Sequence, residues 1–161
     1  MATRQDRKTY DFKSVGNLSS KVIADKYAPE PVPIGITTPM QLGNGSNIFK
    51  MHYDLEKQIG DNLRNLILTN HGERLGRYDF GANIMELVFE LGTDDYDQEA
   101  MMRIKNSVSK FMPFVQLEGF SVEIDHYDNK EVSKVDIFIT YTIPRISRKK
   151  IGLKVTMYGG G

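Results

Sequence analysis

The period at which apolar residues recur changes once along this chain, and that change limits the folds it can adopt. Between residues 55 and 111 apolar residues return every three or four positions, which is the spacing of amphipathic helices. Between residues 120 and 157 they alternate with polar residues, as in strands with one buried face. Helices followed by strands predict an α+β fold, with helices packed on a small antiparallel sheet formed by a C-terminal three-stranded meander.

The helical part predicts three helices. The first follows Asp54, whose side chain can cap it, and stops before Gly72. A short second helix covers residues 84–91, and a third begins at cap candidates in residues 93–95 and ends before Pro113. The apolar side chains expected in the core of this part are Leu55, Ile59, Phe80, Phe89, Ile104 and Val108.

The alternating part predicts the three strands at residues 120–125, 135–143 and 151–157. A turn at residues 127–130 separates the first two, and a basic loop at residues 145–150 separates the last two. The residues of the last strand expected to face the core are Ile151, Leu153, Val155 and Met157.

Residues 1–33 lack a sustained period. Pro29, Pro31 and Pro33 occupy alternate positions, which blocks a helix and favours an extended backbone. We therefore expect an extended N-terminal arm at residues 1–33 and one globular domain at residues 34–161. The arm is either a flexible terminus or a segment that orders on a partner, and its apolar residues favour the second interpretation.

The composition excludes several classes of function. The 161 residues include no cysteine, which excludes disulfides and thiolate sites, and the 21 basic and 21 acidic residues give a net charge of zero. A neutral chain has no general attraction for nucleic acid or for an anionic membrane. No apolar run approaches the roughly 20 residues of a membrane helix, and no secretory signal is recognisable. We therefore expect neither nucleic acid nor membrane as a partner.

Catalytic and cofactor motifs are equally absent from the sequence. The histidines lie in separate segments without metal-ligand spacing, at His52, His71 and His126. Glu73 and Asp79 are the best candidates for the two carboxylates of a glycosidase. However, Arg74 follows Glu73 directly, and a structural ion pair is the simpler interpretation. We expect no catalytic residue, no cofactor and no metal.

One succession of motifs is more specific. The segment 62–74, which ends in Gly72-Glu73-Arg74, is followed by Phe80-Gly81 and by a helix containing Leu87-Val88-Phe89. This succession resembles the baseplate wedge family of contractile phage tails, which has a member in the type VI secretion baseplate and was formerly described as lysozyme-like. The resemblance extends from Ile34 to Tyr158. Some members have Glu-Pro-Arg where this chain has Gly-Glu-Arg.

The resemblance implies a structural subunit rather than an enzyme. Such a subunit docks on the wedge core and initiates assembly of the tail sheath, so its partners are other wedge proteins and the sheath subunit. It is present in several copies in a symmetric baseplate, belongs to the virion, and is assembled in the host cytoplasm. Two alternatives stay open, namely a peptidoglycan hydrolase and the equivalent subunit of a type VI secretion or other contractile injection system.

The residues expected at partner interfaces are Gly72, Glu73, Arg74, Lys154, Val155 and Thr156. In the loop, Gly72 permits a positive φ, and the charged pair that follows can fasten the loop internally or bind a partner. If the last strand lies at the margin of the sheet, its free edge can accept a strand from the sheath subunit. The alternative is an ordinary edge strand that Lys154 protects against pairing.

Overall fold

The computed structural model of this chain describes residues 31–43, 47–88, 96–126 and 132–160. The chain divides into two compact units, residues 1–32 and residues 33–161, and the elements named below belong to the second unit. The predicted features that lie outside the described residues are most of the arm, the helix end at residues 89–92, the caps at residues 93–95 and the turn at residues 127–130.

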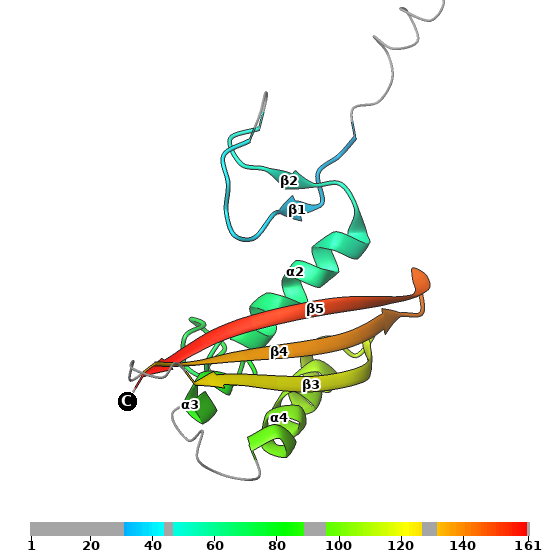
Figure 1. Cartoon of the computed structure of the whole chain (residues 1–161). Coiled ribbons are helices and arrows are strands. Elements are labelled where there is room, and N and C mark those ends of the chain that lie inside the picture. Colours follow the sequence, from blue (N-terminus) through cyan, green and yellow to red (C-terminus); the bar gives the residue numbers. More distant parts are fainter. Residues whose placement is uncertain (1–30, 44–46, 89–95, 127–131, 161) are drawn as a thin grey trace, which may run out of the picture. The chain divides into compact units, whose positions relative to one another are not determined.

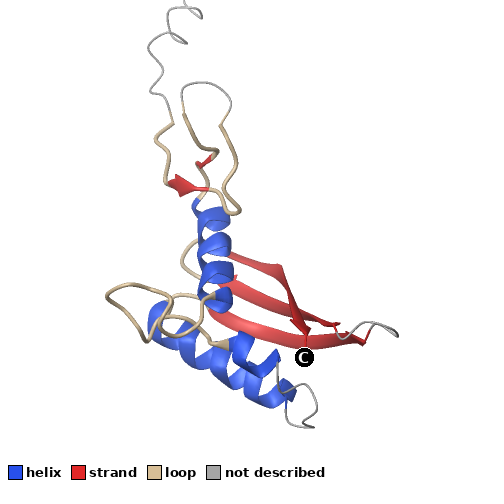
Figure 2. Ribbon diagram, turned by 90° about the vertical axis from the view of Figure 1, so that its left-hand side faces the viewer, coloured by secondary structure: helices blue, strands red, loops and turns tan. Residues whose placement is uncertain are grey.

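The second unit is an α+β domain, as predicted. Its described elements, in chain order, are β1 (Gly35–Ile36), β2 (Met51–His52), α2 (Leu55–Leu68), α3 (Ile84–Val88), α4 (Tyr96–Phe111), β3 (Gln116–His126), β4 (Val132–Ile143) and β5 (Ser147–Gly160) (Figure 1). The last three strands form an antiparallel sheet in the order β3-β4-β5. The helices cover one face of this sheet, and the other face is open (Figure 2).

Helix α2 begins and ends where its capping residues lie. The Asp54 carboxylate accepts a hydrogen bond from the N–H of Glu56, and the Thr69 hydroxyl donates to the carbonyl of Asn65 at 2.6 Å. The placement of Leu55 in the core was wrong, because this side chain is 46 % exposed and burial begins one turn later, at Ile59. The first turn of α2 lies beside the β1–β2 hairpin instead of under the sheet.

The core lies between the helices and the inner face of the sheet. The buried apolar residues of β4 and β5 are Val135, Ile137, Ile139, Leu153, Val155 and Met157, which confirms the alternation predicted for the last strand. Ile59, Ile104 and Val108 are buried on the helices that face them, as predicted, and Phe80 is partly buried against the same core. Among the described residues, no helix is long and apolar enough to cross a membrane.

The basic loop predicted at residues 145–150 is mostly strand. The turn between β4 and β5 covers only residues 144–146, and Ser147 already pairs with Ile143. The charged side chains misled the prediction because residues 148–150 are exposed at the start of the strand, where charge costs little. One of them, Lys150, forms an ion pair with Glu118 of β3 at 2.8 Å.

Candidate functional site

The loop that follows α2 is fastened at its base and exposed at its tip. The N–H groups of Ala82 and Asn83 donate to the carbonyls of Leu66 and Thr69, which holds the end of the loop against the end of α2. Gly72 has a φ of +88°, as expected for a glycine after a helix, and its N–H donates to the carbonyl of Tyr78 at 2.7 Å. Leu75, near the tip, is fully exposed.

Glu73 and Arg74 act separately in this loop. The exposed Glu73 carboxylate accepts hydrogen bonds from the backbone N–H and the side-chain amide of Asn70, at 2.8 and 2.9 Å. The Arg74 guanidinium lies over the ring of Phe80, 4.2 Å from its centroid. The ion pair expected between these neighbours is therefore not formed, because each side chain contacts a different part of the loop.

The electrostatics of the two candidate carboxylates do not suit a general acid. The hydrogen bond from the Asn70 N–H lowers the pKa of Glu73, and the hydrogen bond from Lys110, at 2.7 Å, lowers the pKa of Asp79. A general acid needs the opposite shift, toward neutral pH. No group of three or more acidic or histidine side chains in the described parts of the chain is placed to hold a metal ion.

Beside the loop, Arg74 and three aromatic side chains surround a shallow hollow of about 590 Å³. Phe80 and Phe111 pack with their ring centroids 5.0 Å apart, and Phe114 is 39 % exposed at the rim. An arginine over an aromatic surface is a frequent arrangement in protein interfaces. Two of the predicted loop residues, Glu73 and Arg74, thus line this aromatic hollow.

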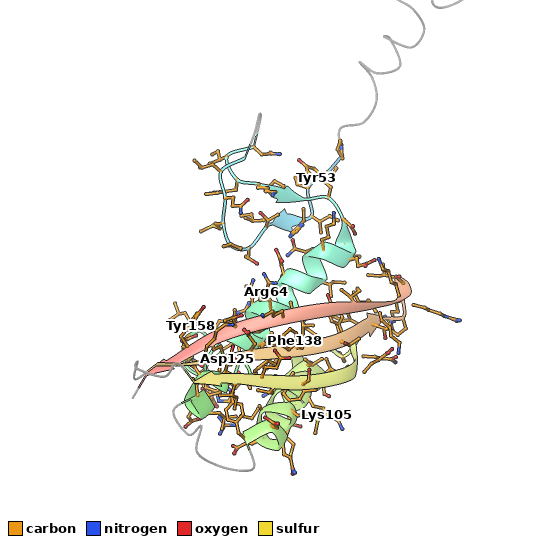
Figure 3. All side chains as sticks on the ribbon, in the orientation of Figure 1. Tyr53, Arg64, Lys105, Asp125, Phe138 and Tyr158 are labelled. Atoms are coloured by element: carbon orange, nitrogen blue, oxygen red, sulfur yellow. The ribbon has the colours of Figure 1, made fainter. Side chains whose placement is uncertain are left out.

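The second predicted site lies on β5, and its three residues point to different sides. Val155 faces the core and is buried. Lys154 and Thr156 lie on the solvent face, and both contact the Asp136 carboxylate of β4, at 3.0 Å and 2.5 Å. Lys134 also binds this carboxylate, at 2.7 Å. Figure 3 shows the same open face, on which Phe138 lies 5.0 Å from the ammonium group of Lys154.

The Asp136 carboxylate binds side chains of both β4 and β5 on the solvent face of the sheet. The sequence analysis did not predict this role. Asp136 is only 3 % exposed although it lies on the outer side of the sheet, because two lysines and a threonine cover it. The hydrogen bond from Lys134 contributes most to holding the pKa of Asp136 well below its usual range, so the carboxylate stays charged. In sequence, Asp136 is one more polar residue in an alternating strand. The cluster fastens β5 to β4.

Strand β5 is an edge strand of the described sheet. In the order β3-β4-β5, this strand pairs with β4 on one side and with no described strand on the other. The ammonium group of Lys154 is bound to Asp136 on the solvent face of the sheet.

His52 has a structural contact that the sequence did not reveal. Its Nε2 lies 2.7 Å from the Asp61 carboxylate, which also accepts the N–H of Thr38 at 2.7 Å. Burial raises the pKa of Asp61, but the hydrogen bonds from His52 and Thr38 outweigh it and lower the pKa overall. The His52–Asp61 pair joins the β1–β2 hairpin to α2. The spacing of residues within one element cannot predict a contact between two elements.

Comparison with known proteins gives a family and a fold. The family model described as Baseplate wedge protein gp25 matches residues 53–153. No curated protein matches the chain. A candidate tail lysozyme from Geobacter sulfurreducens is 22 % identical, with a TM-score of 0.55 over 65 % of this chain and 91 % of that chain, and it shares the fold. A chain of the anti-feeding prophage baseplate is 17 % identical, with a TM-score of 0.47 over 75 % of this chain and 81 % of that one.

Proposed function

The chain belongs to the Baseplate wedge protein gp25 family, and on that premise we propose that it is a structural subunit of a contractile tail that docks on the wedge core and initiates assembly of the tail sheath. The family match carries the proposal, because residues 53–153 include the three helices, the loop at residues 69–83 between α2 and α3, and most of the sheet. The division into an arm at residues 1–33 and a wedge-family domain at residues 34–161 is part of the same proposal.

In this proposal β5 provides the template for the sheath. Its outer edge pairs with no other strand among the described residues, so an incoming strand can extend the sheet there. The Asp136 cluster supports this role, since two separate contacts, from Lys154 and Thr156, hold β5 on β4 and either can be lost while the other remains. The other partners are wedge proteins bound through the loop that contains Arg74. We further propose that several copies of the subunit occupy a symmetric baseplate, that the subunit belongs to the virion, and that it is assembled in the host cytoplasm. In this proposal it binds no cofactor, no nucleic acid and no membrane.

The test is to isolate particles through an affinity tag on this chain and to image them by electron microscopy, alongside particles from cells that lack the chain. We expect the tag to isolate baseplates, and sheath to be missing where the chain is absent. The particle type also distinguishes a phage tail from a secretion or injection system. Sheathed tails of normal length without the chain would contradict the proposal.

We expect Arg74→Ala to impair assembly much more than folding. The side chain lies on Phe80 near the surface, and such a contact contributes about 0.5–1 kcal/mol. The same side chain borders the aromatic hollow where a wedge partner would bind. Occupancy of this subunit in purified baseplates should fall, while the thermal unfolding temperature changes little. Arg77→Ala is the matched control, since Arg77 belongs to the same loop but does not line the hollow. Normal occupancy of Arg74→Ala would refute the loop's role in docking.

We also expect the purified chain to leave peptidoglycan intact. Neither Glu73 nor Asp79 has the raised pKa of a general acid, since hydrogen bonds lower both. The measurement is the turbidity of a peptidoglycan suspension, with a known lysozyme as the positive control. Lysis that disappears in a folded Glu73→Gln variant would establish the hydrolase alternative instead.

A further inference from the structure

The two edges of the sheet are covered to different extents. On β5 the inward residues Leu153, Val155 and Met157 are buried, and Ile151 is partly buried. On β3 the inward residues, among them Phe120 and Val122, are only partly buried against the core. The helices explain the difference, because α2 and α3 pack on β5, whereas α4 packs on β3. The apolar face of the sheet is therefore covered more fully at β5 than at β3.

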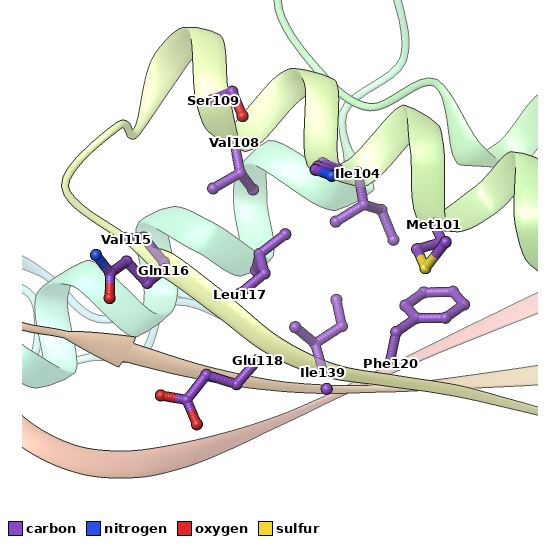
Figure 4. A pocket seen from close by; sticks show the side chains of 12 residues that line it. Met101, Ile104, Val108, Ser109, Val115, Gln116, Leu117, Glu118, Phe120 and Ile139 are labelled. Atoms are coloured by element: carbon purple, nitrogen blue, oxygen red, sulfur yellow. The ribbon is translucent and has the colours of Figure 1, made fainter.

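An apolar groove lies next to the less covered edge. It runs between α4 and β3 and has a volume of about 520 Å³. Met101 and Ile104 of α4 face Leu117 and Phe120 of β3 across it (Figure 4). Met101 is 44 % exposed, although most of the groove lining is apolar; Lys105 and Glu118 are the charged residues in that lining. An additional strand beside β3 would bring apolar side chains into this space and bury that methionine.

The main chain of β3 is also available. Its outer edge pairs with no strand in the described parts of the chain, because β3 is the first strand of the sheet. A bulge between Leu117 and Gly119 interrupts the register with β4, so the regular part of the strand runs from Gly119 to His126. A segment that pairs with this part would satisfy free N–H and C=O groups in addition to filling the groove.

The charged side chains of β3 indicate which residues a segment paired with this strand would carry. The solvent-face side chains of β3 include Glu118, Glu123 and Asp125, and the strand contains no lysine or arginine. Lys150 binds Glu118, and Lys134 lies 3.6 Å from Asp125, but no described residue forms an ion pair with Glu123. Opposite charges on neighbouring strands attract each other, and like charges repel. A strand beside β3 would therefore place lysine or arginine on the solvent face.

We propose that the β3 edge and the α4–β3 groove form a strand-accepting site for an extended segment of another polypeptide. The apolar side chains of that segment, at alternate positions, enter the groove. The lysines or arginines between them lie beside Glu123 and Asp125. The site is at the opposite edge from β5, so a result for one edge leaves the proposed role of the other unaffected.

The test uses the full chain and a short fluorescent peptide in which valine alternates with lysine. A peptide that alternates valine with glutamate is the control. Fluorescence anisotropy should show binding of the lysine peptide and, at most, much weaker binding of the glutamate peptide. Met101→Glu should weaken binding at least tenfold, roughly the effect of losing one buried apolar side chain. The matched variant Met102→Glu changes the adjacent methionine, which is 59 % exposed and outside the groove, and binding should change less than about twofold.

Amide hydrogen exchange should locate the peptide. We expect new protection at residues 119–125 and none along β5. If Met101→Glu does not fold, Glu123→Lys combined with Asp125→Lys provides a second test at exposed positions, and binding should again fall. Absence of binding, equal binding of both peptides, or protection along β5 would overturn the proposal. A peptide-free dimer that Met101→Glu dissociates would overturn it too, because the occupant would then be a second copy.

Discussion

Proline at position 154 or 156 should leave baseplates intact and prevent sheath from growing on them. Proline has no N–H and blocks the pairing of a strand at its position. If β5 templates the first sheath subunits, the proline ring should block the pairing of an incoming strand with β5 and so stop polymerisation. The measurement is electron microscopy of particles from cells that carry Lys154→Pro or Thr156→Pro, after thermal unfolding has shown that the variant protein folds.

Alanine at the same positions is the matched control. Lys154 and Thr156 both contact Asp136, so a proline removes a side-chain contact together with the N–H. Lys154→Ala and Thr156→Ala remove the contact and keep the N–H, and they should carry sheath of normal length. A folded proline variant with full-length sheath would show that β5 is not the template.

A cross-linking experiment tests the same edge without disturbing the strand. The chain has no cysteine, so Tyr158→Cys introduces a unique thiol at a residue of β5 that is 59 % exposed. In assembled particles this thiol should form a cross-link with the sheath subunit. Cross-links that involve wedge proteins but never sheath would contradict the assignment, even if both proline variants failed to fold.

The sequence predicts this fold well where one face of an element is buried along its whole length. The alternation of Ile151, Leu153, Val155 and Met157 against polar residues requires a strand, and the helical spacing of Ile104 and Val108 requires a helix. The prediction fails at the ends of elements. Leu55 continues the apolar stripe of α2 but lies beyond the sheet that would cover it.

The candidate sites were harder to predict because they depend on contacts between elements. Adjacent charges suggested an ion pair of Glu73 with Arg74, yet the carboxylate binds Asn70 and the guanidinium lies on Phe80. The burial of Asp136 results from side chains on two strands, which no spacing within one strand reveals. The groove beside β3 depends on how far α4 covers the sheet, and this requires the three-dimensional packing.

Gly81→Ala should be the most destabilising single change in the loop between α2 and α3, residues 69–83. Gly81 has a φ of +114°, a region that residues with a side chain rarely adopt, and an added Cβ would lie 2.1 Å from the carbonyl oxygen of Thr69. The backbone cannot move away easily, because the N–H of Ala82 donates to Leu66 and the buried hydroxyl of Ser107 donates to the carbonyl of Gly81. Strain and overlap together should lower the free energy of unfolding by at least about 3 kcal/mol.

The variants Gly72→Ala and Gly76→Ala separate the effect of backbone strain from the effect of steric overlap. These glycines have φ values of +88° and +78°, but an added Cβ would meet nothing within 4 Å. Each substitution should therefore cost only the backbone strain, about 1–2 kcal/mol. Urea unfolding of the three variants measures the difference. Gly81 follows the phenylalanine on which Arg74 lies. If the loop docks on a wedge partner as proposed, loss of the Gly81 turn should also reduce the occupancy of this subunit in baseplates. Equal unfolding midpoints for Gly81→Ala and Gly72→Ala would show that the close approach to Thr69 is not enforced in solution.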